Sequence, residues 1–520
     1  MTTASVVTTA ARALLRSRLL TPPGPAQAHR LLREMRRGGT NPVTLLTIAA
    51  ARAPHRAAII DDDGAITYRE LQSKTEAVAC ELYRRGVRPG QAVGILCRNG
   101  RGFLEAVFAV ALVGADVVLV NTEFRTDALA AALSTHRITT VVCDNEFVRQ
   151  LAATGESMTA IDPATIETPE HKRPKVATAG RIVLLTSGTT GKPKGVPRTP
   201  RIISAVGVGA TILDRTGLRI GSRISVAVPM FHGLGLGMTM LSVGLAGTIL
   251  TRRRFDAEAA LAQASLHRAQ AFTAVPVMLA RILDLPYAVR ARNPVPYLRV
   301  VLSSGDRLDP GVARRFMDTY GDILYNGYGS TEVGIGALAT PADLREAPET
   351  VGRPVAGCPV RILDENGNPV GSHVIGRVFV GGKLTAQGYT GGGAKAVVDN
   401  MSSTGDMGYF DESGRLYIVG REDDMIVSGG ENVYPRAVEN ALAEHPDIAD
   451  YAVVGVPDDR FGHRLAAYVV PRPDTGIDEA AVREYLKHKV SRFEQPRDIG
   501  IVSSIPRNPA GKVVRSQLTT

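Results

Sequence analysis

Tryptophan is absent from this chain of 520 residues, and cysteine is scarce. The four cysteines, Cys80, Cys97, Cys143 and Cys358, are scattered without paired spacing. That distribution argues against a structural zinc site and favours a reducing compartment, so we expect a cytoplasmic protein. Because no run of about 18 apolar residues occurs, no membrane-spanning helix is expected. A hydrophobic content of 44% over this length instead predicts a globular protein with more than one domain.

Acidic residues are almost missing from the first 40 positions, where Glu34 faces seven arginines. The arginines are Arg12, Arg16, Arg18, Arg30, Arg33, Arg36 and Arg37. Apolar residues at helical spacing among them, Ala28, Leu31, Leu32 and Met35, predict a basic amphipathic helix in residues 1–41. We favour a helix docked on the main body over contact with an anionic membrane surface or a cleaved transit peptide. Nucleic-acid binding is disfavoured because the rest of the chain is nearly balanced in charge.

Helical patterns and short apolar runs alternate from Pro42 onward, which predicts an α/β fold with a large N-terminal region of mixed, mostly parallel sheets. Residues 68–84 have the pattern of an amphipathic helix. The expected strands are 93–96, 116–120, 224–228, 248–250, 298–302 and 322–325. Composition shifts near Gly420, and the last 100 residues have strands and helices of their own, as expected of a small α+β domain.

The segment Leu184–Val196, LLTSGTTGKPKGV, is an apolar run followed by a loop suited to phosphate. Glycines let the backbone approach an anion, hydroxyls donate hydrogen bonds, and lysines supply charge. The spacing differs from a Walker loop because Pro193 follows Lys192. The candidate phosphate-binding residues are Thr186, Ser187, Gly188, Thr189, Thr190, Gly191, Lys192 and Lys194.

This loop resembles, nearly residue for residue, the signature loop of the adenylate-forming superfamily of acyl-CoA and aryl-CoA synthetases, peptide-synthetase adenylation domains and firefly luciferase. Three further segments resemble motifs of that superfamily in the same order: YNGYGSTE at 325–332, STGDMGY at 403–409 and PRNPAGKVVR at 506–515. The resemblance covers the chain from about residue 42. It implies an AMP-binding N-terminal domain at 42–420 and a mobile C-terminal lid domain at 421–520.

The resemblance also implies roles for individual residues. In YNGYGSTE we expect a glycine-rich turn that presents Thr331 and Glu332 side by side. Thr331 would contact the α-phosphate, and Glu332 would hold Mg²⁺, a cation that prefers carboxylate and phosphate oxygens. Asp406 and Arg421 would bind the ribose. Lys512 would bridge the substrate carboxylate and the α-phosphate during adenylation. The remaining predicted nucleotide contacts are Ser304, Gly305, Tyr328 and Gly329.

Pro229–Gly235, PMFHGLG, resembles the acyl-pocket segment of acyl-CoA and aryl-CoA synthetases, with His232 near the reacting carboxylate. Residues 232–240 contain no acid that could pair with an ammonium group, which disfavours an amino-acid substrate. Glycines at 233, 235 and 237 would leave room for an apolar chain. We therefore expect a medium- or long-chain fatty acid, with an aryl acid as the alternative.

The acceptor is expected to be CoA. SGGENVYP at 428–435 resembles the loop of CoA synthetases in which Gly429 and Gly430 flank the pantetheine passage, and Asp423 matches the hinge of the lid domain. ATP, Mg²⁺ and CoA are thus the expected cofactors, with a small carboxylic acid as substrate. The alternatives are a fatty-acyl-AMP ligase that loads a carrier protein and a non-catalytic nucleotide-binding homologue. One departure from the family stands out, because Ser303-Ser304-Gly305-Asp306 replaces the usual Gly-Gly-Ala adenine loop.

Overall fold

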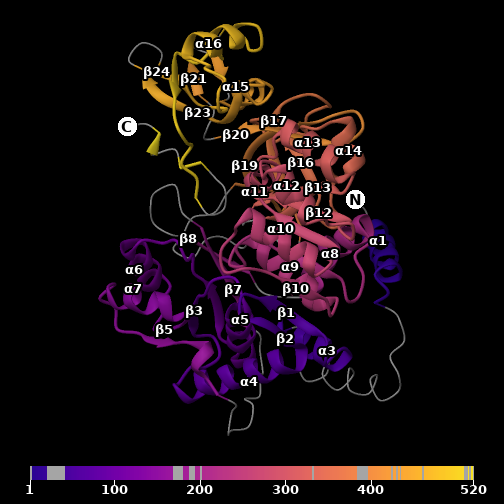
Figure 1. Cartoon of the computed structure of the whole chain (residues 1–520), viewed down its shortest axis with the longest axis vertical. Coiled ribbons are helices and arrows are strands. Elements are labelled where there is room, and N and C mark those ends of the chain that lie inside the picture. Colours follow the sequence, from indigo (N-terminus) through magenta and orange to yellow (C-terminus); the bar gives the residue numbers. More distant parts are fainter. Residues whose placement is uncertain are drawn as a thin grey trace.

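The computed structural model consists of a large N-terminal body of sheets covered by helices and a smaller C-terminal body at one end (Figure 1). The predicted fold class is confirmed. The described residues are 3–19, 41–167, 180–186, 194–198, 202–330, 333–382, 396–422, 426–428, 431–433, 435–458, 462–492, 494–508, 513–514 and 517–518.

The largest sheet has nine described strands and a parallel centre. In spatial order they are β15 (Arg353–Pro354), β14 (Gly334–Ala339), β13 (Leu324–Ser330), β12 (Val300–Ser304), β11 (Ala271–Ala274), β9 (Arg223–Val226), β10 (Thr248–Leu250), β1 (Ala57–Asp61) and β2 (Gly64–Thr67). The strands β2, β14 and β15 are antiparallel to their neighbours. Helices α8 (Ile202–Thr216), α9 (Gly233–Gly244), α10 (Ala257–Leu266), α11 (Pro276–Leu283), α12 (Tyr287–Arg292), α13 (Pro310–Tyr320) and α14 (Pro341–Glu346) belong to this part of the chain.

A second sheet has six described strands, all parallel except β8. Their order is β6 (Thr159–Ile161), β5 (Thr140–Cys143), β3 (Ala92–Leu96), β4 (Asp116–Leu119), β7 (Ile182–Thr186) and β8 (Lys194–Arg198). The helices of this region are α3 (Val43–Arg52), α4 (Tyr68–Arg84), α5 (Arg101–Val113), α6 (Thr126–Thr135) and α7 (Val148–Ala152).

Local sequence explains two of these helices. α4 begins where expected because Thr67 and Glu70 form a capping box, in which each side chain bonds the other residue's backbone N–H. α5 is apolar apart from Arg101 and Glu105, and every residue from Phe103 to Val113 is buried. Such a helix is stable only inside a core, and α5 packs against α4 on one side and β3 and β4 on another.

The remaining two sheets are mainly antiparallel, and the first of them contains the STGDMGY segment. The first contains β16 (Val360–Leu363), β17 (Gly376–Gly381), β18 (Val397–Val398), β19 (Met401–Phe410) and β20 (Leu416–Arg421). The C-terminal sheet contains β21 (Ile426–Ser428), β22 (Glu431–Val433), β23 (Ile448–Asp458), β24 (Gly462–Pro471) and β25 (Asp498–Ile501), with helices α15 (Pro435–Ala443) and α16 (Glu479–Lys487). The chain passes from one sheet to the other between Arg421 and Ile426, which is where we propose the domain boundary.

The N-terminal helix α1 spans Thr3–Arg16 and packs along α8 (Figure 1). Arg12 and Arg16 form ion pairs with Asp214 at 3.2 and 3.3 Å, and Ala13 is buried. The helix predicted around Ala28–Met35 lies outside the described residues. Within the described part of the chain, no helix is long and apolar enough to cross a membrane.

Candidate functional site

The parallel strands of the nine-stranded sheet end at one edge, where several predicted site residues lie. His232 follows β9, Ser304 and Gly305 end β12 and begin the next loop, and Tyr328 lies near the end of β13. Ligands of open α/β sheets bind at this carboxyl edge because the loops there diverge and leave a crevice. The edge is therefore the candidate nucleotide and acid site.

Tyr328 and the two predicted ribose contacts form one cluster. The Tyr328 hydroxyl donates a hydrogen bond to Asp406 Oδ2 at 2.5 Å, and Arg421 Nη1 lies 3.5 Å from Asp406 Oδ1. Asp406 and Arg421 are directly opposite each other on β19 and β20. Burial, followed by the nearby Asp406 carboxylate, raises the pKa of Tyr328 well above its usual value, so its hydroxyl remains a donor. The resulting carboxylate beside a guanidinium can accept hydrogen bonds from two adjacent sugar hydroxyls.

The backbone around Asp406 holds its carboxylate in place. Gly405 has φ +78°, and a Cβ there would lie 3.1 Å from Arg421 Nη2. The Asp406 N–H donates to Thr404 Oγ1 at 3.1 Å, and Arg421 Nη1 donates to the Thr404 carbonyl at 3.2 Å. The positive φ thus favours glycine before the carboxylate, and a side chain there would also press on the Arg421 guanidinium.

The YNGYGS segment is a strand, which corrects the expectation of a glycine-rich turn. Residues 325–330 lie in β13, paired antiparallel with β14. A Cβ at Gly329 would lie 1.9 Å from the Gly334 carbonyl oxygen, so glycine permits close approach of the two strands rather than a turn. Thr331 and Glu332 fall between these strands, outside the described residues.

The loop after β12 adjoins this strand. Ser304 is opposite Gly327 across the β12–β13 pair, and Gly305 has φ +95°, a conformation that favours glycine. Ser304 and Tyr328 therefore lie on neighbouring strands at the same edge, as expected if both border one nucleotide.

The predicted phosphate loop is described only at its ends. β7 and β8 pair antiparallel, and Thr186 is opposite Lys194. The predicted residues that lie outside the described parts of the chain are Ser187, Gly188, Thr189, Thr190, Gly191, Lys192, Thr331, Glu332, Asp423, Gly429, Gly430 and Lys512. Their roles remain predictions.

His232 precedes α9, and its ring lies 4.5 Å from the ring of Phe231. Its segment is fixed by Asn99, which sequence reasoning missed. Asn99 is buried, donates to the Val228 carbonyl at 2.9 Å, and accepts from the Met230 N–H at 2.8 Å. A lone asparagine carries no motif, and only its position after the apolar strand β3 could have pointed to it.

The glycines of α9 have different functions, which corrects part of the argument for a long acyl chain. A Cβ at Gly235 would lie 2.2 Å from the Pro229 carbonyl oxygen, so Gly235 is required for helix packing. A Cβ at Gly233 would first meet Leu184 at 3.8 Å, and one at Gly237 would meet nothing within 4 Å. The open face of α9 is thus limited to Gly233 and Gly237.

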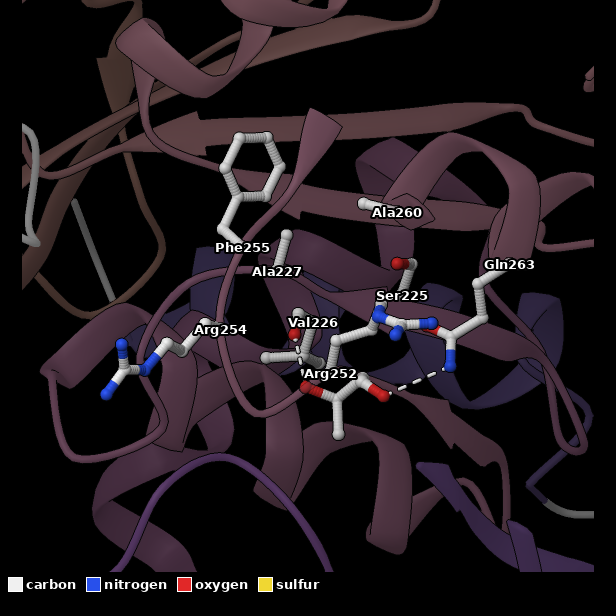
Figure 2. A pocket seen from close by; sticks show the side chains of 9 residues that line it. Ser225, Val226, Ala227, Arg252, Arg254, Phe255, Ala260 and Gln263 are labelled. Atoms are coloured by element: carbon white, nitrogen blue, oxygen red, sulfur yellow. Dashed lines mark hydrogen bonds between the residues drawn. The ribbon is translucent and has the colours of Figure 1, made fainter. Parts of the chain in front are cut away.

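Figure 2 shows a small pocket lined by residues of β9, of the segment that follows β10 and of α10, none of which is a predicted contact. Its lining includes Ser225, Thr251, Arg252, Phe255 and Gln263. Gln263 donates to the Thr251 carbonyl at 3.0 Å, and Arg252 pairs with Asp62 at 2.8 Å. Because Gln263 and Arg252 already bond other groups of the protein, we assign the pocket no ligand.

Metal binding is predicted at Glu332. Among the residues described here, no three His, Cys, Asp or Glu side chains gather in a group that could hold a metal ion.

Comparison with known proteins defines the class. The model of the AMP-binding enzyme family matches residues 46–390, and that of the AMP-binding enzyme C-terminal domain matches residues 437–512. A feruloyl-CoA synthase from Amycolatopsis sp is 31% identical over 479 residues, covering 90% of this chain and 96% of that protein. The chain belongs to the AMP-binding enzyme family, which confirms the predicted resemblance.

Solved structures agree. The o-succinylbenzoate CoA synthetase from Bacillus subtilis, in complex with an acyl-adenylate intermediate, has a TM-score of 0.82 at 26% identity and covers 92% of this chain and 98% of its own. A Mycobacterium tuberculosis fatty acyl CoA synthetase shares the fold, with a TM-score of 0.73 at 24% identity and coverage of 93% and 98%. These findings define an AMP-forming CoA ligase, a class that uses ATP, Mg²⁺ and CoA as predicted.

Proposed function

We propose that this protein activates an apolar carboxylic acid with ATP to an acyl-adenylate and transfers the acyl group to CoA. The observation that carries the proposal is the Tyr328–Asp406–Arg421 cluster at the edge where the strands of the nine-stranded sheet end. It would supply a ribose site at the same end of the sheet as the segment that leads to His232. Adenylation is needed because a free carboxylate lacks a good leaving group, and AMP provides one.

Each part of the chain has a proposed task. Asp406 and Arg421 anchor the ribose, and the residues between β7 and β8 hold the β- and γ-phosphates. Mg²⁺, held by Glu332, would offset phosphate charge. Lys512 would stabilise the charge that develops on the α-phosphate as the carboxylate attacks.

For the acid we favour an aromatic carboxylate over a fatty acid. The 31% identical relative is a feruloyl-CoA synthase, and Gly235 serves packing rather than a channel for an acyl chain. A medium- or long-chain fatty acid is the second candidate, supported by the open face at Gly233 and Gly237. Both acids lack an ammonium group, consistent with the absence of acidic residues from 232–240.

The test is a substrate panel with ATP, Mg²⁺ and CoA, containing hydroxycinnamates, benzoates and fatty acids of 8 to 16 carbons. We expect release of AMP and pyrophosphate, with the highest kcat/KM for an aromatic acid. A higher value for a fatty acid would reverse the order of the two candidates. Turnover only when a carrier protein replaces CoA would contradict CoA as the acceptor. Nucleotide binding without AMP release from any acid would contradict the proposed adenylation.

A further inference from the structure

The segment after β12 faces the C-terminal body with three charged side chains. We call residues 306–309 the docking strip. Asp306 Oδ2 lies 3.9 Å from Arg507 Nη1, and Arg307 Nη1 lies 3.8 Å from Glu439 Oε2. Asp309 accepts a hydrogen bond from the Tyr451 hydroxyl. Charges on the strip thus alternate in sign and meet complementary groups, which fixes the register of contact between the two bodies.

The partners of the strip are oriented within their own body. Arg507 is held in a fork by Asp450, with Nη2–Oδ1 at 2.7 Å and Nε–Oδ2 at 3.3 Å. Glu439 accepts from the Val453 N–H at 3.3 Å. Because Asp450 already orients the guanidinium, contact with Asp306 needs little further ordering of Arg507.

Arg507 also anchors the segment that carries the predicted catalytic lysine. Arg507 and Val513 form an antiparallel bridge, and the Val514 N–H donates to the Pro506 carbonyl at 2.8 Å. Residues 506–507 and 513–514, which flank Lys512 in the sequence, are therefore paired with each other. At the other end of the contact, Asp306 directly follows Gly305 of the predicted nucleotide loop.

We propose that Asp306 is a positioning residue for acyl-adenylate formation, holding Arg507 and thereby aligning the Lys512 segment with the nucleotide. This inference rests on the proposed function, and it accounts for the departure from the usual Gly-Gly-Ala loop. The contact is weak because both side chains reach solvent: those of Asp306 and Arg507 are 34% and 19% exposed. A partly solvated pair is readily separated, as a lid domain requires between two half-reactions.

The test compares the two half-reactions in Asp306→Asn, Arg507→Gln and the double variant of the full-length protein. Acid-dependent ATP–pyrophosphate exchange reports adenylation, and CoA with supplied acyl-adenylate reports thioester formation. Asp306→Asn is expected to lower the exchange kcat about threefold to fivefold, because a partly exposed ion pair contributes little and its loss only partly misaligns the catalytic group. The ATP dissociation constant and the thioester rate should change by less than about twofold, and the double variant should be no slower than Arg507→Gln.

Asp318→Asn is the matched control, because Asp318 forms an exposed ion pair with Arg345 inside the N-terminal body. It should leave both half-reactions unchanged. Loss of ATP affinity alone in Asp306→Asn would assign Asp306 to the adenine instead, and equal loss of both half-reactions would indicate general damage; either result overturns the inference. Absence of exchange in the wild-type protein would contradict the proposed function itself, whereas normal wild-type exchange with an unaffected Asp306→Asn would contradict this inference alone.

Discussion

Two joints connect the parts of this molecule, and they differ in chemistry. At the first, Asn99, which follows a strand of the six-stranded sheet, bonds Val228 and Met230 beside the nine-stranded sheet. At the second, the docking strip meets Arg507, Glu439 and Tyr451. The first joint consists of uncharged hydrogen bonds to Asn99, which is 7% exposed. The second depends on charged side chains that are partly exposed to water.

This difference separates a permanent joint from a reversible one. Removing a partner from a buried hydrogen bond leaves a polar group unpaired, at about 1–3 kcal/mol. A partly exposed ion pair is worth about 0–1 kcal/mol because water replaces it. We therefore expect the floor of the site to remain fixed if the C-terminal body separates and docks again.

The largest expected effect concerns the buried core beside the permanent joint. Glu105 on α5 is 4% exposed, and burial raises its pKa to about 7 from 4.5. The folded protein thus holds this proton more tightly than the unfolded chain, so the stabilisation is full below pH 4.5 and is lost as pH rises through 7. We expect the free energy of unfolding to fall by about 3 kcal/mol from this group between pH 4.5 and 8.

Urea unfolding at pH 5 and pH 8 measures this change, and Glu105→Gln should flatten it. An equal pH dependence in wild type and Glu105→Gln would exclude Glu105 as its source.

The next largest effect is expected on breaking the permanent joint. Asn99→Ala leaves the Val228 carbonyl and the Met230 N–H without their partner, so we expect a loss of about 2 kcal/mol in the free energy of unfolding. It should also lower kcat/KM, because the segment before His232 loses its support. Asn368→Ala, at an exposed position, is the control. If the free energy of unfolding falls no more than in the control, Asn99 does not hold the two sheets together.

Breaking one contact of the reversible joint should cost less. Tyr451→Phe removes the hydroxyl that bonds Asp309 and keeps the ring, so we expect a loss below about 1 kcal/mol. Hydrogen exchange should increase in the docking strip while β3, β4 and α5 remain protected. A loss as large as that of Asn99→Ala would show that the two joints do not differ.

The smallest effect is expected at the N-terminal helix. Asp214→Asn removes the charge that pairs with Arg12 and Arg16, whose side chains are 57% and 60% exposed. We expect about 0.5 kcal/mol weaker docking of α1, seen as faster hydrogen exchange in α1 with unchanged activity. Unchanged exchange in α1 would mean that packing on α8 alone holds the helix.

Sequence patterns predicted the parts whose causes are local or carried by a motif. The helix 68–84 follows from its capping box and periodicity. The family resemblance assigns Asp406 and Arg421 to one ribose, and the two residues are opposite each other on β19 and β20. The strand 325–330 was misread as a turn because its glycines serve a close approach between strands, which depends on β14.

The missed features depend on residues far apart in the chain. α1 is held by Asp214, about 200 positions away. The polar groups of Asn99 and Asp306 have roles that depend on their distant partners, Val228 and Arg507. Composition and periodicity describe neighbours in sequence, so neither could reveal these contacts. The apolar run before the phosphate loop was expected, but the strand β8 after it, which pairs with β7, was not.

The most direct test of the central claim is a single-turnover experiment on the wild-type protein with the preferred acid, ATP and Mg²⁺, first without CoA. We expect about one equivalent of pyrophosphate per enzyme with AMP retained as acyl-adenylate, followed by release of AMP and thioester once CoA is added. Release of AMP at the same rate without CoA, or no pyrophosphate with any acid, would contradict an enzyme that works through an acyl-adenylate and a reversible joint.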